Sequence, residues 1–258
     1  GKELKFIDYQ QNKYFLSEVM INTDDDKLYG KKVKFLDNQQ NKYLLNEVMI
    51  NTDNDNLYGK SKLAAEKSVQ RLSEETGNSA IIYRLPGVFG KWCKPNYNSV
   101  VATFCYNIAN QLPIQIDDPN KLLKLVYIDD VIKSFIQTLQ KKDNTAKQSS
   151  VTPVYSITIQ ELAAQLQLFF DSRKTLITER VGSKITRALY ATYLSFLTPN
   201  QFTYDLPSFP DERGVFAEVL KTRDSGQFSF FTTLPGITRG QHYHQSKSEK
   251  FILWSLAI

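Results

Sequence analysis

The sequence predicts an α/β domain followed by a short all-β segment. From Ser61 onward, stretches with apolar residues at helical spacing alternate with short runs typical of buried strands, which is the pattern of an α/β domain. Near residue 205 the helical spacing stops, and short alternating runs separated by turns follow, as in a sandwich or barrel. The fold class is therefore α/β with a smaller all-β part at the end.

Composition bounds the kind of protein. The 258 residues are enough for one or two domains, and the 32 Lys and Arg exceed the 27 Asp and Glu by only five. Because the basic residues are scattered among acids, they indicate a solvated surface, and we expect no nucleic-acid partner. No apolar run reaches the roughly 18 residues of a membrane-spanning helix. The start of the chain shows no apolar segment of a secretory signal, and two cysteines fit a reducing compartment, so we expect a cytoplasmic protein without a membrane partner.

The first 60 residues contain a direct repeat. The segment KFIDYQQNKYFLSEVMINTDDDKLYGK at 5–31 recurs as KFLDNQQNKYLLNEVMINTDNDNLYGK at 34–60, with 21 of 27 positions identical. Solenoid arrays need about three units to bury a shared core, so two copies indicate a tandem duplication instead. We therefore assign residues 1–60 to a duplicated 29-residue unit.

The next part of the chain, 57–204, carries the α/β elements. Apolar residues at helical spacing predict helices over 61–76, near 100–108, and over 129–139, 161–170 and 188–197. Buried-strand patterns cover 80–85 and 123–128, while 141–150 is polar and reads as a loop. Residues 198–200 and 207–210 read as a linker, and strands are predicted over 214–220, 227–234, 241–244 and 250–256.

Tyr58 and Lys62 form the first candidate site. They stand four apart at the start of a helix, so both lie on one face. A phenol with a pKa near 10 is a poor acid at neutral pH, and a nearby ammonium lowers that pKa. The pair could then pass a proton to a carbonyl oxygen, although an isolated pair of this kind is more often plain surface. The first repeat copy has Tyr29 but carries Val33 where the second has Lys62.

The longer context resembles a known family. The segments YGKSKLAAEK, YRLPGVFGKWCKPNYNSVVATF and LVYIDDV, from Leu57 onward, are similar to the extended short-chain dehydrogenase/reductases that act on nucleotide sugars. The similarity is greatest to the CapF-type bifunctional epimerase/reductases of capsular polysaccharide synthesis. This resemblance implies a Rossmann-like reductase domain followed by a cupin, which here would occupy 205–258 and be incomplete.

The resemblance also implies an activity. In these enzymes the cupin epimerises a UDP-4-keto-6-deoxy sugar, and the reductase domain then delivers hydride from NADPH to C4, toward UDP-N-acetyl-L-fucosamine. Tyr58 would be the catalytic acid, and Lys62 would lower its pKa and hold the nicotinamide ribose. The remaining implied residues line the cofactor and the UDP-sugar: Arg84 and Pro86 on the cofactor side, and Asn96, Asn98 and Tyr127, with Asp129 beside Tyr127, on the substrate side.

Two features depart from the family pattern. The family begins with a glycine-rich turn that receives the pyrophosphate of the cofactor at a helix N-terminus, and no G-x-x-G-x-x-G occurs here. The duplicated unit stands in its place. In the family, the active-site Ser or Thr lies farther before the catalytic tyrosine than Thr52 lies before Tyr58. Val48 and Met49 occupy the region where that Ser or Thr is expected. Thr52 is the available hydroxyl.

A second candidate site lies near the end of the chain. Residues 236–249, GITRGQHYHQSKSE, fit the first cupin motif G-x5-H-x-H-x4-E and contain both histidines of the protein. Residues two apart on a strand point to the same side, so His242 and His244 could face one metal ion, with Glu249 joining from the next strand. This donor set suits zinc or another divalent metal. A polar surface loop is the alternative, and the second cupin motif is missing.

Three readings of function remain open. The first is an enzyme of this family, NADP(H)-dependent and acting on a UDP-sugar, represented here by part of the longer architecture. The second is a catalytically inactive module that binds a sugar nucleotide or a metal, which the missing glycine-rich turn favours. The third is an interaction protein built on the duplicated unit. The sequence leaves a homo-oligomer open.

Overall fold

The structure is a computed structural model. It describes residues 4–7, 13–16, 21–23, 26–28, 32–36, 42–49, 57–77, 79–140, 148–240, 243–246 and 248–253, and within these ranges it describes side chains at residue 60 and from residue 63 onward.

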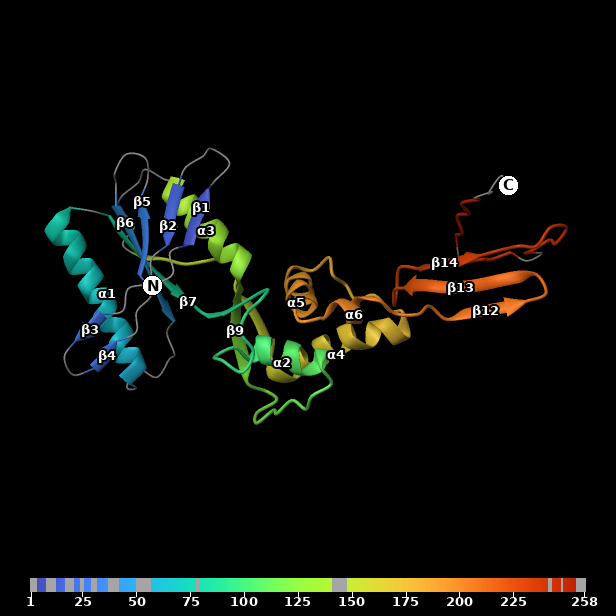
Figure 1. The fold of residues 1–258 in the computed structure, drawn as a ribbon, viewed down its shortest axis with the longest axis horizontal. Helices are drawn as coiled ribbons and strands as arrows, with labels where there is room; N and C mark the ends of the chain where they lie inside the picture. Colours follow the sequence, from blue (N-terminus) through green and yellow to red (C-terminus); the bar gives the residue numbers. More distant parts are fainter. Residues whose placement is uncertain are drawn as a thin grey trace.

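The strands and helices follow one another along the chain (Figure 1). The strands are β1 (Leu4–Ile7), β2 (Lys13–Leu16), β3 (Ile21–Thr23), β4 (Asp26–Leu28), β5 (Lys32–Leu36), β6 (Lys42–Met49), β7 (Ala80–Leu85), β8 (Gly87–Phe89), β9 (Leu122–Tyr127), β10 (Gln148–Ser149), β11 (Tyr155–Thr158), β12 (Ser208–Asp211), β13 (Gly214–Lys221) and β14 (Gln227–Phe231). The helices are α1 (Leu57–Thr76), α2 (Val100–Ala109), α3 (Ile128–Gln140), α4 (Ile159–Thr175), α5 (Lys184–Leu194) and α6 (Pro199–Phe202).

The two repeat copies begin alike and then diverge. Each forms an antiparallel hairpin in the same register, with Phe6 opposite Tyr14 in the first copy and Phe35 opposite Tyr43 in the second. Beyond the hairpin, the first copy forms the small β3–β4 hairpin, whereas the second leads into α1. Among the described residues, Leu28 ends β4 while its counterpart Leu57 begins α1, so tertiary context decides the conformation at this position.

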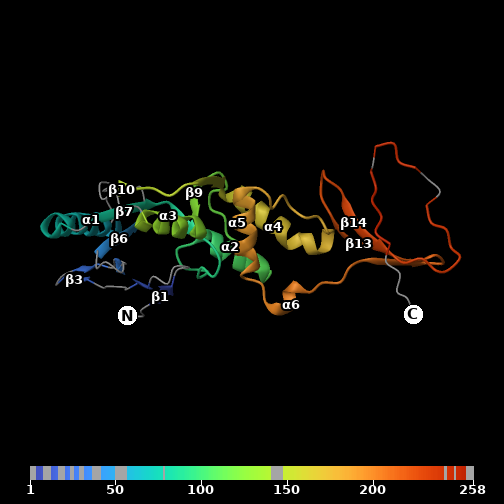
Figure 2. The same ribbon diagram turned by 90° about the horizontal axis from the view of Figure 1, so that it is seen from above.

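The first sheet has strand order β10-β7-β6-β5, in which β6, β7 and β10 run parallel and β5 is antiparallel. Side chains alternate between its faces along β7. Tyr83 reaches α3 on one face, where it bonds Thr138 and Ser134, and Arg84 reaches Glu66 of α1 on the other. The sheet therefore lies between α1 and α3 (Figures 1 and 2), and its strand β6 lies inside the second repeat copy.

Pro86 separates β7 from β8 and marks a change of sheet. β8 pairs with β9 in parallel, and β9 pairs with β11 antiparallel. Proline has no N–H to donate to a ladder, so it suits the point where the chain leaves the first sheet. β9 contributes side chains to two hydrophobic cores. Val126 packs in the core that contains the buried residues of β7, and Leu125 packs in a second, larger core.

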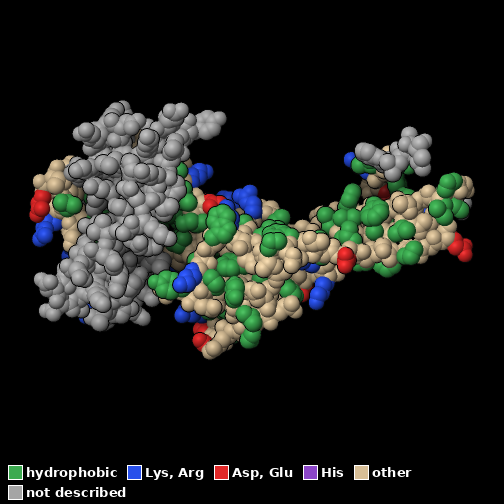
Figure 3. Space-filling view, viewed as in Figure 1, with side chains coloured by type: hydrophobic (Ala, Val, Ile, Leu, Met, Phe, Trp, Pro, Cys, Tyr) green, Lys and Arg blue, Asp and Glu red, His purple; other side chains and the backbone are tan. Residues whose placement is uncertain are grey.

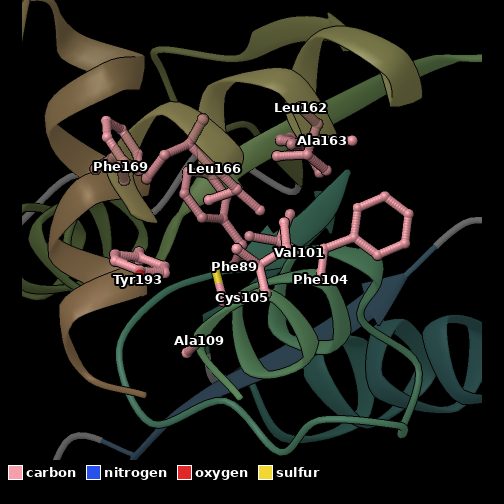
Figure 4. Packing of buried hydrophobic residues seen from close by; sticks show 14 residues of the cluster. Phe89, Val101, Phe104, Cys105, Ala109, Leu162, Ala163, Leu166, Phe169 and Tyr193 are labelled. Carbon is pink, nitrogen blue, oxygen red and sulfur yellow. The ribbon is translucent and has the colours of Figure 1, made fainter. Parts of the chain in front are cut away.

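That larger core joins α2, α4 and α5 to the second sheet (Figure 4). Its largest fully buried side chains include Phe89, Phe169 and Tyr193, and Phe169 meets Tyr190 edge to face. α4 begins with a capping box, in which Thr158 and Glu161 satisfy each other's backbone N–H groups. This core holds the segment that follows β8 against the rest of the chain.

A separate sheet, β12-β13-β14, extends away from the helices as an arm (Figures 1 and 2). Several groups of hydrophobic side chains are visible on its surface (Figure 3). Residues 207–210 were expected in a linker, and that expectation is wrong: Phe209 pairs with Phe216 across β12 and β13, and Pro210 is tolerated because β12 is an edge strand.

Most other sequence-based elements agree with the structure within a few residues, and β7 covers 80–85 as predicted. Three differ. The polar stretch 141–150 contributes β10 to the first sheet, because two of its residues pair with β7. Residues 199–202 form α6 instead of a linker. The described parts of 241–244 and 250–256 are not strands, and their remaining residues lie outside the description.

Within the described part of the chain, no helix combines the length and the apolar character that crossing a membrane requires.

Removing the hydroxyl should affect the free energy of unfolding differently at two buried tyrosines. Among the described residues, the Tyr193 hydroxyl has no hydrogen-bond partner, whereas the Tyr83 hydroxyl bonds Thr138 and Ser134. We expect Tyr193→Phe to leave the free energy of unfolding unchanged or raise it, and Tyr83→Phe to lower it by about 1 kcal/mol. Urea unfolding measures both, and a larger loss for Tyr193→Phe would contradict the assignment.

Tyr193→Phe should also change how the free energy of unfolding depends on pH under alkaline conditions. Burial raises the pKa of Tyr193 to about 12. The folded state therefore binds more protons than the unfolded state between the ordinary pKa near 10 and that value. The stabilisation is complete below pH 10 and is lost as the pH rises toward 12, so unfolding curves of Tyr193→Phe should depend less on pH in this window.

Candidate functional site

The candidate site forms where parallel strands end. β6 and β7 run side by side, with Met49 opposite Leu85 at their carboxyl ends, and α1 follows β6. Ligands of α/β proteins bind at this edge of a sheet. Tyr58 and Lys62 lie in the first two turns of α1 and therefore share one helix face. Their side chains are outside the description, as is Thr52 altogether.

An ion pair ties α1 to β7 just beyond these two residues. Arg84 Nε donates to Glu66 Oε1 at 3.0 Å, and Arg84 Nη2 donates to Glu66 Oε2 at 2.9 Å. Glu66 is 5% exposed, while 41% of the Arg84 side chain is exposed. The hydrogen bond to Glu66 raises the pKa of Arg84. Sequence reasoning placed Arg84 at the cofactor and missed Glu66, although its position four residues after Lys62 was a signal.

A second cluster forms where β8 and β9 end together. Phe89 lies opposite Tyr127 in the parallel register, and their ring centroids are 5.5 Å apart. Lys91 follows β8 and Asp129 begins α3, and Lys91 Nζ lies 3.3 Å from Asp129 Oδ2 and 6.0 Å from the Tyr127 ring centroid. The structure thus places Tyr127, Asp129 and Lys91 together at the ends of β8 and β9.

Charges in this cluster act on Tyr127 in opposite directions. Burial, followed by the Asp129 carboxylate, raises the pKa of the Tyr127 phenol, and Lys91 opposes that effect. The hydrogen bond to Asp129 raises the pKa of Lys91. Tyr127 therefore stays a neutral hydroxyl at physiological pH, with its O–H donated to Asp129.

The segment 90–99 leads from this cluster into α2. Trp92, Asn96 and Asn98 have positive φ angles of 62°, 56° and 53°. Asparagine tolerates this conformation, but a bulky tryptophan does so only when its surroundings hold it there. The backbone N–H of Trp92 donates to Oγ of Ser195 at 3.2 Å, so the residue that follows α5 supplies part of that support.

The same segment presents its side chains to solvent. Asn96 and Asn98 are both exposed, and Trp92 is 81% exposed. The backbone N–H of Asn96 donates to Thr103 Oγ1 at 2.9 Å, which leaves the Asn96 amide side chain outside that bond. A held backbone with exposed amides suits recognition of a polar ligand, and Pro86 lies one strand upstream, between β7 and β8.

The C-terminal candidate site is only partly described. His244 Nε2 lies 3.2 Å from Glu249 Oε1, so two of the three residues singled out are together, whereas His242 lies outside the description. Tyr243 and His244 are not in a strand, so the expected strand placement of the motif is wrong there. In the described residues no three His, Cys, Asp or Glu side chains converge as a metal site. Arg239, just upstream, donates to Asp211 Oδ1 at 3.3 Å and thereby connects the motif to β12.

Two family models match the chain. The model of the NAD dependent epimerase/dehydratase family covers residues 19–155, and the model of the polysaccharide biosynthesis C-terminal domain covers residues 209–255. The chain belongs to the NAD dependent epimerase/dehydratase family. The first match includes β3 through β10, and the second includes the arm sheet, apart from its first residue Ser208, and the histidine motif.

Similar proteins are longer than this chain. A UDP-2-acetamido-2,6-beta-L-arabino-hexul-4-ose reductase of Pseudomonas aeruginosa is 56% identical over 193 residues, which are 75% of this chain and 52% of that protein. The crystal structure of the capsular polysaccharide assembling protein CapF from Staphylococcus aureus matches with a TM-score of 0.74 at 40% identity, over 81% of this chain and 57% of that one. A CapF structure with the inhibitor 3-isopropenyl-tropolone matches with a TM-score of 0.67 at 34% identity, over 79% and 64%. The chain spans about half the length of the curated relative.

Gly90 permits the contact between β8 and the start of α3. A Cβ added there would lie 2.2 Å from Ile128 Cγ2 and 3.0 Å from Ile128 Cβ, whereas one added at Gly182 meets nothing within 4 Å. We expect Gly90→Ala to lower the free energy of unfolding by about 1–3 kcal/mol, as overpacking does, and Gly182→Ala to have little effect. Urea unfolding of both variants measures this, and equal values would contradict a tight junction.

Proposed function

We propose that this chain carries the reductase portion of a nucleotide-sugar epimerase/reductase. It would reduce the C4 ketone of a UDP-4-keto-6-deoxy-N-acetylhexosamine on the way to a capsular polysaccharide precursor. The observation that carries the proposal is the placement of Tyr58 and Lys62 on one face of α1, at the carboxyl end of β6, in a chain of this family. The name of the Pseudomonas aeruginosa relative supports the substrate class.

The residues of the chain suit the nicotinamide end of a nicotinamide dinucleotide better than its pyrophosphate. Tyr58 and Lys62 supply a phenol and an ammonium that suit the nicotinamide riboside, and Pro86 and Arg84 follow at the end of β7. No glycine-rich turn is present in the sequence to accept the pyrophosphate closely. We propose NADP(H) as the cofactor, held at its nicotinamide end by these residues. When bound, it supplies a hydride.

The chemistry assigned to the protein is a proton transfer. The Tyr58 phenol donates its proton to the C4 carbonyl oxygen while that carbon gains the hydride, so the ketone becomes a secondary alcohol. Lys62 stabilises the resulting phenolate by its charge, and water restores the proton. Thr52 is proposed as a further hydrogen-bond donor to the same oxygen.

The substrate is proposed to bind along segment 90–99. Asn96 and Asn98 offer exposed amides for the UDP part, and Tyr127, in the cluster at the ends of β8 and β9, offers a neutral hydroxyl. The held backbone of this segment limits the entropy that ligand binding must overcome. These assignments extend the resemblance residue by residue to positions that the structure describes.

The C-terminal part, 205–258, is proposed to be the beginning of a cupin that epimerises the sugar. His242, His244 and Glu249 would hold zinc or another divalent metal, which suits a mixed imidazole and carboxylate donor set. The 3.2 Å approach of His244 to Glu249 supports this grouping. A cytoplasmic location and assembly into a homo-oligomer belong to the same proposal.

A catalytically inactive module that binds a sugar nucleotide is the second candidate. Titration of the chain with NADPH, followed by the fluorescence of the reduced nicotinamide, separates the two. A dissociation constant in the micromolar range would support the reductase. Binding of the UDP-sugar without any binding of NADPH would support the inactive module.

The two repeat copies should differ in their effect on catalysis. With NADPH and the 4-keto sugar nucleotide, we expect Tyr58→Phe to lower the rate of NADPH oxidation by about two to four decades, because a positioned proton donor is lost. Tyr29→Phe is the matched control, since Val33 stands where a lysine would be needed, and it should leave the rate nearly unchanged. Equal losses would exclude Tyr58 as the acid.

The metal proposal predicts a weak zinc site. Calorimetric titration of the chain with zinc should give saturable binding, which His244→Ala or Glu249→Gln should weaken by at least about tenfold, because each removes a ligand. Glu212→Gln, which changes an exposed carboxylate in the same part of the chain, serves as the control. Isotherms that are the same for His244→Ala and the parent would mean that the pair does not bind zinc.

A further inference from the structure

Glu66 is an unusual residue for the middle of a helix face. Of the described side chains, it is the one carboxylate in the buried class, and it lies on α1 one turn before buried Val69. Burying a carboxylate is costly unless it is paired and hydrogen-bonded. Arg84 supplies that pairing through two bonds, one to each carboxylate oxygen. The pair therefore joins α1 and β7 at a fixed point.

The form of the contact restricts rotation as well as distance. A guanidinium and a carboxylate meet as two planar forks, and both bonds are kept only if the groups stay coplanar and aligned. Rotation of α1 about its axis would break one of the two bonds. A lysine, which is a point charge on a flexible stem, would not impose that restriction.

The helix carries this restriction to the candidate catalytic residues. Tyr58, Lys62 and Glu66 follow at intervals of four, so each is offset by only about 40° from the next, and all three fall on one stripe of α1. Tyr58 lies about 12 Å along the axis from Glu66. Because side chains extend about 5–6 Å from the helix axis, a rotation of about 20° would move the end of such a side chain by about 2 Å.

We propose that Glu66 and Arg84 are positioning residues that set the rotation of α1 and thereby place Tyr58 and Lys62 over the carboxyl end of the sheet. This rests on the proposed function for its catalytic consequence. Misplacement of a reacting group by about 1 Å can cost about 100-fold in rate, so a displacement of this size is enough to matter. Arg84 thus influences the site through Glu66 and α1.

A second ion pair on the same helix offers a matched control. Arg71 Nε lies 3.5 Å from Glu75 Oε1, with both side chains more than half exposed. This pair links two turns of α1 to each other and does not reach the sheet. Glu75→Gln therefore removes the same charge from the same helix without releasing its rotation.

The first test needs neither cofactor nor substrate. The full chain is labelled with 3-fluorotyrosine, and the Tyr58 resonance is identified by its absence in Tyr58→Phe. We expect Glu66→Gln to move this fluorine resonance, Arg84→Lys to move it less, and Glu75→Gln to leave it in place. Tyr193 lies in the larger core, with α2, α4 and α5, and its fluorine resonance reports whether each variant remains folded. A Tyr58 resonance that Glu66→Gln leaves unmoved in the folded chain would overturn the proposal.

If the Glu66→Gln chain does not fold, Arg84→Lys is used for the same test, because it keeps a positive charge beside the buried carboxylate. In that case, a Tyr58 resonance that matches the parent would overturn the proposal. Glu75→Gln shows how far the loss of one charge on α1 moves the resonance, so a larger shift with Glu66→Gln in a chain that stays folded supports positioning. Failure of the reductase assay would count against the proposed function and leave this result standing.

Where the chain reduces the keto sugar, kinetics give a second readout. We expect Glu66→Gln to lower kcat about 10- to 100-fold with little change in KM for the sugar nucleotide, because the acid is misplaced while the substrate still binds. In the Tyr58→Phe background, Glu66→Gln should cost little more, since both act through one group. Fully additive losses would show that Glu66 acts independently of Tyr58 and would overturn the proposal.

Discussion

The parallel pairing of β6 with β7 is the constraint on which the rest of the structure depends. Parallel neighbours cannot be joined by a tight turn, so a crossover must link them, and α1 is that crossover. The crossover brings the start of α1 to the carboxyl end of the sheet and lays one of its faces on β7. The arrangement of the candidate catalytic residues follows from this topology and from the Glu66 contact with Arg84.

The helices and central strands could be read from the sequence because their apolar spacing is local. β7 and the helices around it carry buried residues at regular intervals, and the alternation along β7 matches the two helices that cover its faces. The role of the repeat could not be read in this way. Its copies are nearly identical and form the same hairpin, yet among the described residues it is the second copy that pairs with β7 in the parallel sheet and leads into α1. Most of α1 lies beyond the repeated residues, so the repeat alone does not show this difference.

The candidate site, too, could be predicted from the sequence only in part. Tyr58 and Lys62 are four apart on one helix, and such a spacing is visible in any sequence. Glu66 with Arg84, and Lys91 with Asp129, join residues 18 and 38 positions apart, and their pairing is set by packing that a single sequence does not display. The C-terminal sheet was predicted in outline. Pro210 concealed β12, because proline usually argues against a strand and is accepted here at an edge.

The two edges of the arm sheet differ in their capacity for unwanted association. β12 carries Pro210, which removes a backbone donor from that edge and disfavours the addition of another strand. β14 has the sequence QFSFF, without charge or proline, and its phenylalanines are exposed. Such an edge is a template for intermolecular β-pairing, so aggregation of the chain at high concentration or during folding would begin at β14.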